Sequence, residues 1–135
     1  MSNSALAVQI ALRDALLAHA PLTALLGGGH VFDEIPRGSP PPHVVFAGIE
    51  TRDWSVQGQK AHEHFISIEV KTNSRSHQLA QDIVAAIEDA LDGAALILAG
   101  HALVNLHIQF WTVARDKASE NFNATLRFRA ATEPL

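Results

Sequence analysis

Residues 62–91 read HEHFISIEVKTNSRSHQLAQDIVAAIEDAL, and the hydrophobic period changes along them from two residues to about four. In the first part, Ile66, Ile68 and Val70 alternate with polar side chains, which predicts a β-strand with one buried face. In the second part, leucine and isoleucine recur every four residues, which predicts an amphipathic helix that Gly93 ends. A strand followed directly by a helix is therefore the central unit of the fold.

The same patterns predict further elements on both sides of this unit. Residues 4–20 form a helix with Leu6, Ile10 and Leu17 on one apolar face and Leu12 and Leu16 beside it. Pro21 begins a short second helix, which three glycines end. Residues 94–99 either extend the central helix or connect it to the next strand. Further strands are predicted at 30–35, 43–50, 104–111 and 122–132, with the strand at 43–50 covered on both faces and with long loops at 36–42 and 51–61.

The predicted order is helix, short helix, three strands, helix and two strands. Strands that follow one another, without alternating helices, indicate an α+β fold with a small antiparallel or mixed β-sheet packed against two main helices. A chain of 135 residues fits one domain, so we assign residues 1–135 to a single domain.

Composition excludes several classes of protein. The chain has no cysteine, so it is neither a disulfide scaffold nor an enzyme with a thiolate nucleophile. No apolar run approaches the roughly 20 residues that cross a bilayer, and the first residues do not resemble a secretory signal. We therefore expect a soluble protein with no membrane partner. A formal net charge of −4 argues against binding nucleic acid by neutralising its phosphates.

Two histidines give the strongest case for a metal site. His62 and His64 lie two residues apart on one face of a strand, a spacing that can hold a metal, with His101 or His107 as a third ligand. The simpler interpretation, which we favour, is two polar side chains at the solvent-exposed start of a strand. We therefore predict no metal, and we keep a small metal-binding or catalytic α+β domain as the alternative function.

Other reactive side chains form no catalytic pattern. Asp33, Glu34 and Asp53 fall in loops that are expected to be solvated, whereas acid–base catalysis by a carboxyl group needs a buried pocket. Ser39 lacks the spacing of a nucleophile elbow, and residues 27–29 lack the lysine of a phosphate-binding loop. We therefore predict that the protein is not an enzyme and has no cofactor.

Four residues are candidates for binding a protein partner. Arg127 and Arg129 share one face of the last strand, which is more typical of a solubilising or partner-facing surface than of a nucleic-acid site. Trp54 lies in a polar loop, where it either folds back onto the core or anchors a partner. Arg37 begins the part of the proline-rich loop that we expect to make contacts, because loops of such length usually bind something.

Several stretches, taken in order, resemble one family: the tail-completion or tail-terminator proteins of phages with long non-contractile tails, of prophages and of gene transfer agents. The resemblance covers nearly the whole chain. It is carried by residues 11–28, HVFDEIP at 30–36, PPHVVF at 41–46, TRDWS at 51–55, residues 64–72 and 79–91, GHALV at 100–104 and LRFRAATEP at 126–134.

The resemblance implies a structural role in a virion or phage-like particle that assembles in the bacterial cytoplasm. Such proteins form a ring, usually a hexamer, on the head-proximal end of the tail tube. The ring stops polymerisation of the major tail tube protein, joins the tail to the connector or stopper protein on the head side, and lets DNA pass through its bore. The resemblance does not distinguish a phage, a prophage and a gene transfer agent as the source.

The physical properties of the chain are compatible with this role. A ring needs two different patches on each subunit, which an unpaired strand edge and protruding loops can supply. Acidic groups facing the bore would repel phosphates, so that DNA slides without sticking. Within the same class, a head-completion protein or a tube subunit is an alternative. Tube subunits usually have more strands and a long hairpin, which the sequence does not predict.

Overall fold

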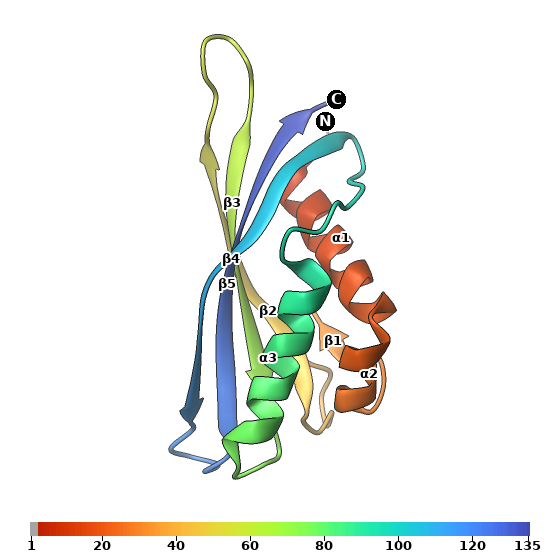
Figure 1. The fold of residues 1–135 in the computed structure, drawn as a ribbon, viewed down its shortest axis with the longest axis vertical. Coiled ribbons are helices and arrows are strands. Elements are labelled where there is room, and N and C mark those ends of the chain that lie inside the picture. The colour runs from red at the N-terminus through yellow and green to blue at the C-terminus, as the bar shows by residue number, and fades with distance from the viewer. Residues whose placement is uncertain (1–2) are drawn as a thin grey trace.

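In the computed structural model, which describes residues 3–135, three helices lie against one face of a five-stranded sheet (Figure 1). The order of elements along the chain is the predicted one, and the fold is α+β. The elements are α1 (Ser4–Ala18), α2 (Ala20–Leu26), β1 (Val31–Phe32), β2 (His43–Asp53), β3 (His62–Lys71), α3 (His77–Leu91), β4 (His101–Arg115) and β5 (Phe122–Pro134).

The sheet is mixed, with strand order β1-β2-β3-β5-β4. The short β1 runs parallel to β2 and pairs with it only at Val44 and Val45. All other neighbours are antiparallel, so the four long strands alternate in direction across the sheet. The central strands β3 and β5 stay in register over their whole paired length, from His62 opposite Thr132 to Lys71 opposite Asn123.

The helix ends are fixed by local hydrogen bonds. The side chain of Asn3 accepts a hydrogen bond from the backbone N–H of Leu6 at the start of α1, and Ser76 accepts one from Gln78 at the start of α3. Gly27 ends α2 in the left-handed conformation, with φ at 77°, as the glycine run predicts. Residues 94–99 form a connector and do not extend α3.

The core lies between the helices and the inner face of the sheet. The inward-facing side chains of the two central strands meet the buried stripe of α3, which is the stripe that the four-residue repeat predicts. At the centre, Phe128 of β5 is fully buried. The members with no exposed surface include Leu16, Leu22, Val44, Ile68, Val70, Ile83, Ile87, Leu91 and Leu126.

The predicted apolar face of α1 is only partly correct: Leu12, Leu16 and, in part, Leu17 pack on the core. Leu6 and Ile10 are 51% and 52% exposed, and the buried row is formed instead by Val8, Leu12 and Leu16. The physical reason is the row of alanines beside this buried row, which are partly or fully buried and let the helix approach the core closely. The positions of leucine and isoleucine alone therefore do not predict which side of α1 faces the core.

The predicted loop at 51–61 is also wrong, because most of it belongs to a long β-hairpin between β2 and β3. The backbone N–H of Trp54 donates to the carbonyl of Ala61 over 2.8 Å, and Val56 pairs with Gln59. Gln57 and Gly58 make the turn, with φ at 50° and 80°. The alternation of apolar and polar residues is absent because this hairpin projects beyond the helices, so neither of its faces is covered.

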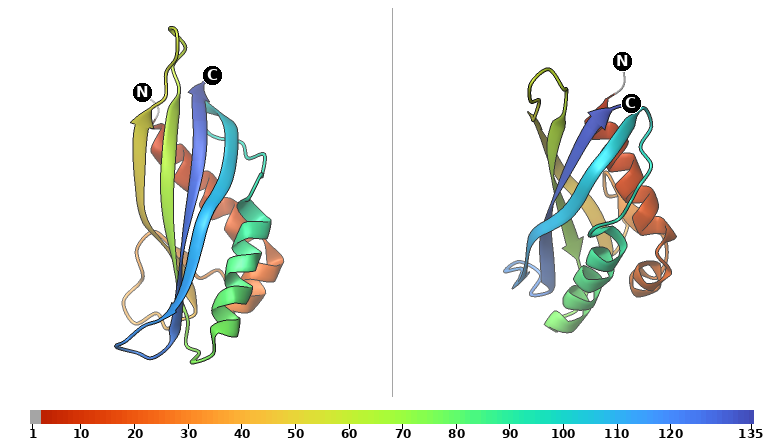
Figure 2. Two further views of the ribbon diagram at one scale, coloured as in Figure 1. Left: turned by 60° about the vertical axis from the view of Figure 1, so that its left-hand side comes forward. Right: turned by 45° about the horizontal axis from the view of Figure 1, so that its top comes forward.

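The same projection corrects the expectation that β2 is covered on both faces. The strand is well buried only from His43 to Phe46, and from Ala47 onward nearly every side chain is exposed. The strand continues beyond the short β1 and out along the hairpin. The β2–β3 hairpin and the turn between β4 and β5 lie at opposite ends of the sheet (Figures 1 and 2).

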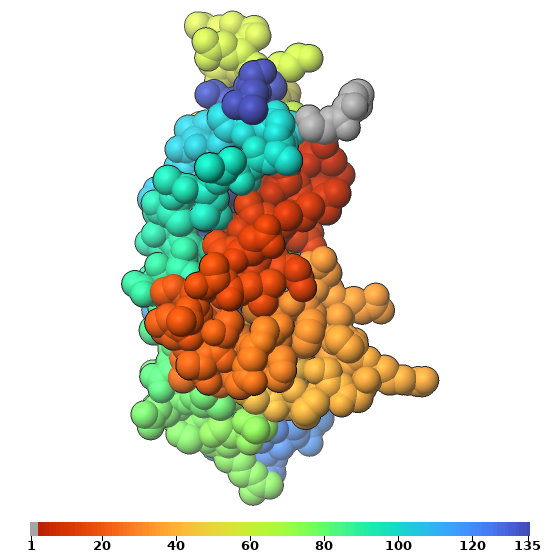
Figure 3. Space-filling model, turned by 90° about the vertical axis from the view of Figure 1, so that its right-hand side faces the viewer, coloured from red at the N-terminus to blue at the C-terminus, as the bar shows by residue number. Residues whose placement is uncertain are grey.

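The side of the molecule formed by the helices is closely packed. In Figure 3, α1 crosses this side obliquely and the loop between β1 and β2 projects beside it. Among residues 3–135, no single helix is long and apolar enough to cross a membrane. The pair α1 and α2 together reach that length and composition, but they are bent by 79° relative to each other.

Replacing Phe128 by alanine should lower the free energy of unfolding by about 3–5 kcal/mol, because it leaves a cavity in the centre of the core. The matched control is Phe110→Ala on the neighbouring strand, where the side chain is 48% exposed and the expected cost is below about 1 kcal/mol. Urea denaturation followed by circular dichroism measures both. Equal losses for the two variants would contradict this position of the core.

Candidate assembly surface

The helices cover one face of the sheet, and the opposite face is bare (Figure 2). Outward-pointing side chains of β2, β3 and β5 form what we call the bare face. Because side chains alternate along a strand, these are the residues that the alternating pattern predicts to be polar. Its central members are Glu50 and Arg52 from β2, Glu63 and Phe65 from β3, and Arg127 and Arg129 from β5.

Arg129 is held at the upper part of the bare face by two acceptors. Its Nε and a terminal nitrogen lie 3.0 and 2.9 Å from the same carboxylate oxygen of Glu63, on the adjacent strand. The other terminal nitrogen donates to the side-chain oxygen of Asn105 over 3.3 Å. Both members of the ion pair are less than a quarter exposed, so solvent screens this pair less than a surface pair.

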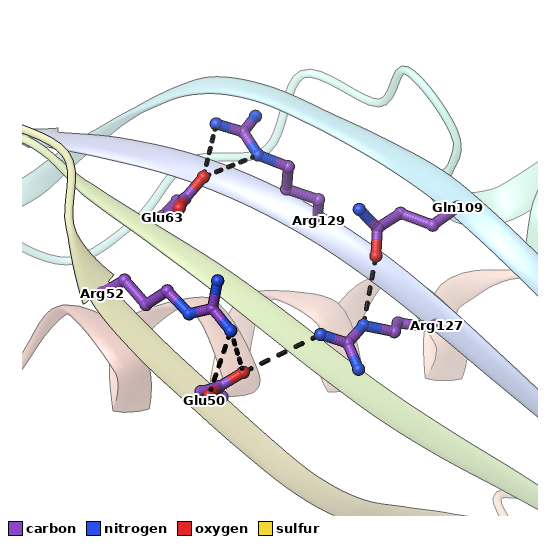
Figure 4. Close-up of polar contacts among 6 residues, drawn as sticks. All are labelled: Glu50, Arg52, Glu63, Gln109, Arg127 and Arg129. Carbon is purple, nitrogen blue, oxygen red and sulfur yellow. Dashed lines mark hydrogen bonds and ion pairs between the residues drawn. The ribbon is translucent and has the colours of Figure 1, made fainter.

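A second carboxylate holds two more guanidinium groups (Figure 4). Glu50 accepts from Arg52 at 3.2 and 3.4 Å, and a nitrogen of Arg127 lies 3.8 Å from it. Arg127 also donates from Nε to the side chain of Gln109 on β4, over 3.1 Å. Three guanidinium groups are therefore tied to two carboxylates across three strands.

Aromatic rings support the same guanidinium groups. Arg52 and Arg127 lie 5.0 and 4.8 Å from the centre of the Phe65 ring, which explains why an aromatic residue occupies an outward position. Arg129 lies 4.9 Å from the ring of Trp54. Each contact contributes modestly at an exposed site, but together they restrict where the guanidinium groups can move.

Trp54 neither enters the core nor projects freely into solvent. It rests on Arg129 and is 41% exposed, beside a shallow hollow of about 280 Å³ that Val56 and Val104 also line. Lys60 and Glu133 also line the hollow. The structure thus brings three of the predicted partner-binding residues together on the bare face: Trp54, Arg127 and Arg129.

The fourth candidate, Arg37, lies elsewhere. It is exposed in the loop between β1 and β2, at the opposite end of the sheet from the tip of the β2–β3 hairpin (Figure 2). Glu50 and Glu63, which hold the arginines, were missed as site residues. The available signal was the position of Glu63 on the polar side of a predicted strand.

The simpler interpretation of the histidines places His64 at the exposed start of a strand, and this is wrong. It belongs to the inward series that continues to Val70, and its side chain is fully buried. Its Nδ1 lies 2.8 Å from the hydroxyl of Thr51, and its Nε2 lies 2.9 Å from that of Thr132. Both ring nitrogens are therefore engaged by hydroxyl groups.

The other histidines do not complete a metal site with it. His107 points elsewhere and lies 3.4 Å from Asp92 at the end of α3. Within residues 3–135, no group of three or more histidine and carboxylate side chains is arranged to hold a metal ion. Burial lowers the pKa of His64 to about 4, with smaller contributions from His62 and His101, so the ring is neutral at pH 7.

Two strand edges are only partly covered. At the middle of β4, the end of α3 covers the edge: Gly93 donates to the carbonyl of Leu106 over 2.7 Å, and Ile108 donates to the side chain of Asp92 over 2.8 Å. Past this point, Phe110 and Trp111 are about half exposed. At the other side of the sheet, no described residue pairs with the outer edge of β2 beyond Val45.

The features of this surface are ion pairs, exposed aromatic side chains and free strand edges. These features suit contacts between large molecules better than chemistry on a small substrate. Together with the α+β fold, they define a structural, interaction-forming protein.

Comparison with known proteins agrees with this class. Residues 10–133 match the family described as Tail completion protein gp17, so the chain belongs to that family. A chain of a solved structure described as "Virion of native gene transfer agent (GTA) particle" is 30% identical, with a TM-score of 0.88. The match covers 98% of this chain and 99% of that one. No curated protein sequence matches. The protein is thus a structural tail component of a virion or phage-like particle.

The buried histidine predicts a loss of stability in acid. The pKa of His64 is about 4 in the folded chain and 6.5 when unfolded, so the unfolded chain binds the extra proton between these values. The stability that the neutral ring contributes is complete above pH 6.5 and is lost as the pH falls towards 4. The loss should be on the order of 3 kcal/mol.

Urea titrations at pH 7.5 and pH 4.5 measure this loss. The variant His64→Gln can keep both hydroxyl contacts without titrating, and it should lose less stability than the wild type on acidification. His77→Gln, at an exposed position, is the control and should behave as the wild type does. An identical acid-induced loss of stability in His64→Gln and in the wild type would refute the role of His64 in this loss.

Proposed function

We propose that the protein is a tail terminator whose whole chain, residues 1–135, forms one domain. It forms a ring, a hexamer by the family resemblance, on the head-proximal end of the tail tube, where it stops polymerisation. The ring joins the tail to the connector or stopper protein on the head side, and DNA passes through its bore. Membership of the tail completion family supports this role, and no arrangement described above favours catalysis.

The observation that best supports a ring is that the sheet has two partly free edges, one at β2 and one at β4. The long strands are four, in the order β2-β3-β5-β4, and each is antiparallel to its neighbour. Because the number of long strands is even, β2 and β4 run in opposite directions. When β4 of one copy lies beside β2 of a copy in the same orientation, these two strands are therefore again antiparallel. The two edges differ from each other, as the head-to-tail interface of a closed ring requires.

The layer order favours one orientation of the sheet in such a ring. In any closed ring, the outer layer has a longer circumference than the inner layer. The helices, about 10 Å thick with their side chains, need that additional room. The bare face, which carries no helix, is therefore the face that turns towards the bore.

The two ends of the sheet then face the two axial partners. One end carries the β2–β3 hairpin and the hollow beside Trp54, and the other carries the β4–β5 turn and the loop of Arg37 (Figure 1). Both ends have projecting segments that suit contacts with the major tail tube protein and with the head-side connector. Trp54 is the strongest single candidate, because a half-exposed, supported tryptophan is typical of interface anchors.

The structure also bears on the alternative functions. The argument against a tube subunit loses one of its two parts, because the structure does contain a long hairpin, whereas the number of strands is the predicted one. Tail completion, which the matching family is named for, is instead what supports a terminator over a tube subunit or a head-completion protein. The metal-binding alternative loses its support, because both ring nitrogens of His64 are engaged.

The mass of the purified protein by light scattering, alone and with assembled tail tubes, tests the proposal. We expect a closed ring in solution, or a ring that appears when tubes are present and caps them at fixed length. A protein that stays a monomer and leaves tube growth unchanged would contradict the proposal.

The free edge of β4 gives a second test. Trp111→Lys places a charge at the edge, where it should abolish ring formation, because charged edge residues block strand pairing. Ala85→Lys, on the exposed side of α3, is the control and should leave the ring intact. Normal capping by Trp111→Lys, measured by tube length in electron micrographs, would exclude pairing at this edge.

A third test concerns the hollow. Trp54→Ala should fold normally, since the indole side chain lies outside the core. It should weaken attachment of the oligomeric ring to its axial partner at least tenfold. Cosedimentation of the variant with tubes and with the connector measures this. Unchanged binding to both partners would remove Trp54 from the contact.

A further inference from the structure

The bare face carries as many carboxylates as cations, although the chain as a whole is acidic. Its outward positions hold four of each kind, and the ion pairs described above are joined by a pair between Lys71 and Glu69, whose atoms lie 3.7 Å apart. Every cation on this face is therefore paired with a carboxylate of the same face. The cations are Arg52, Lys71, Arg127 and Arg129, and the carboxylates are Glu50, Glu63, Glu69 and Glu133.

The acidic surplus lies on another part of the molecule. Asp82, Glu88 and Asp89 lie along α3, on the side turned away from the core, and Asp92 follows at the end of the helix. The prediction that acidic groups face the bore stays a prediction, but the orientation proposed above would place these residues outside the ring. The bare face must then avoid DNA by another means.

Arginines facing a DNA channel present a physical problem. Each guanidinium that neutralises a phosphate releases counterions, and several of them on each subunit of a ring would hold the duplex in place. A guanidinium already bound to a carboxylate must break that pair before it can bind a phosphate, and the carboxylate repels the approaching phosphate. Internal pairing thus removes the attraction.

We propose that Glu50 and Glu63 keep the bare face from holding DNA, by occupying the guanidinium groups of Arg52, Arg127 and Arg129. This inference rests on the proposed function, because it gives the pairs a role only where DNA passes this face. The contacts with Phe65 and Trp54 support it, since they keep the guanidinium groups beside their carboxylates.

Stabilisation of the fold alone explains the arrangement less well. Exposed ion pairs contribute little to stability, and Glu50 and Arg52 are both more than half exposed. A sheet face with no DNA beside it would be equally soluble with unpaired charges of one sign. The shared use of one carboxylate by two arginines from different strands leaves no cation of this group free.

The test compares two variants of the chain of residues 1–135 that differ from the wild type by the same formal charge. Glu50→Gln with Glu63→Gln frees three guanidinium groups on the bare face, and Asp82→Asn with Glu88→Gln removes two charges from α3. The probe is a fluorescent 20-base-pair duplex, titrated at several salt concentrations and followed by anisotropy.

We expect the wild type and the α3 variant to bind the duplex weakly. The bare-face variant should bind it at least tenfold more tightly at low salt, with log K falling against log salt by a slope of about −2.7, since three phosphates are neutralised. Equal binding by both variants would mean that total charge alone determines the affinity for DNA, and would overturn the inference. Absence of binding by the bare-face variant, or strong binding by the wild type, would also overturn it.

Folding and ring formation are tested separately. Circular dichroism reports whether the double variant folds. Should it not fold, Glu50→Gln alone, at an exposed position, frees two guanidinium groups and should bind more tightly than Asp82→Asn. Capping of tubes by the wild type tests the ring itself. Failure to cap would refute the proposed function, whereas the DNA titration decides the inference about Glu50 and Glu63.

Discussion

The packing of α1 and α3 against a single face of the sheet is the constraint on which the rest of the structure depends. It buries the inward series of β3 and β5, with Phe128 at its centre, and so supplies most of the apolar burial that stabilises a small domain. It also leaves the opposite face without a cover. Every outward side chain on that face must then be compatible with water or with another molecule, which is why charged and aromatic residues gather there.

The same constraint explains how the edges are treated. The end of α3 reaches the middle of β4 and covers its edge through Gly93 and Asp92, but the helix is too short to cover the rest. On the other side, β1 covers only the first residues of β2. Natural sheets usually protect exposed edges with charges, prolines or bulges. Two bulges interrupt β4, yet Phe110 and Trp111 remain half exposed there, which is the pattern of an edge that takes part in assembly.

The sequence was sufficient for the order of elements and for the orientation of β3, α3 and β5, because each of these has one buried and one exposed face. It failed for the hairpin around Trp54, where neither face is covered and the hydrophobic pattern carries no information. It failed in part for α1, where Leu6 and Ile10 face solvent and partly buried alanines lie beside the row of Val8, Leu12 and Leu16. The ion pairs that Arg127 and Arg129 make depend on the register between strands, which no pattern within one strand specifies, so these two arginines were found but their carboxylate partners were not.

The net charge of the chain does not describe the charge balance of the bare face. The chain carries a charge of −4, but its bare face balances cations against carboxylates, and its acidic surplus lies along α3. A polyanion that passes close to a surface responds to the charges within about a Debye length, roughly 8 Å at physiological salt, and hardly at all to those on the far side of the domain. For a protein proposed to surround DNA without holding it, local pairing is therefore a more reliable device than a total negative charge. Local pairing also allows arginines to line such a surface, although an unpaired positive charge there would bind DNA. Their long side chains pack well on Phe65 and Trp54.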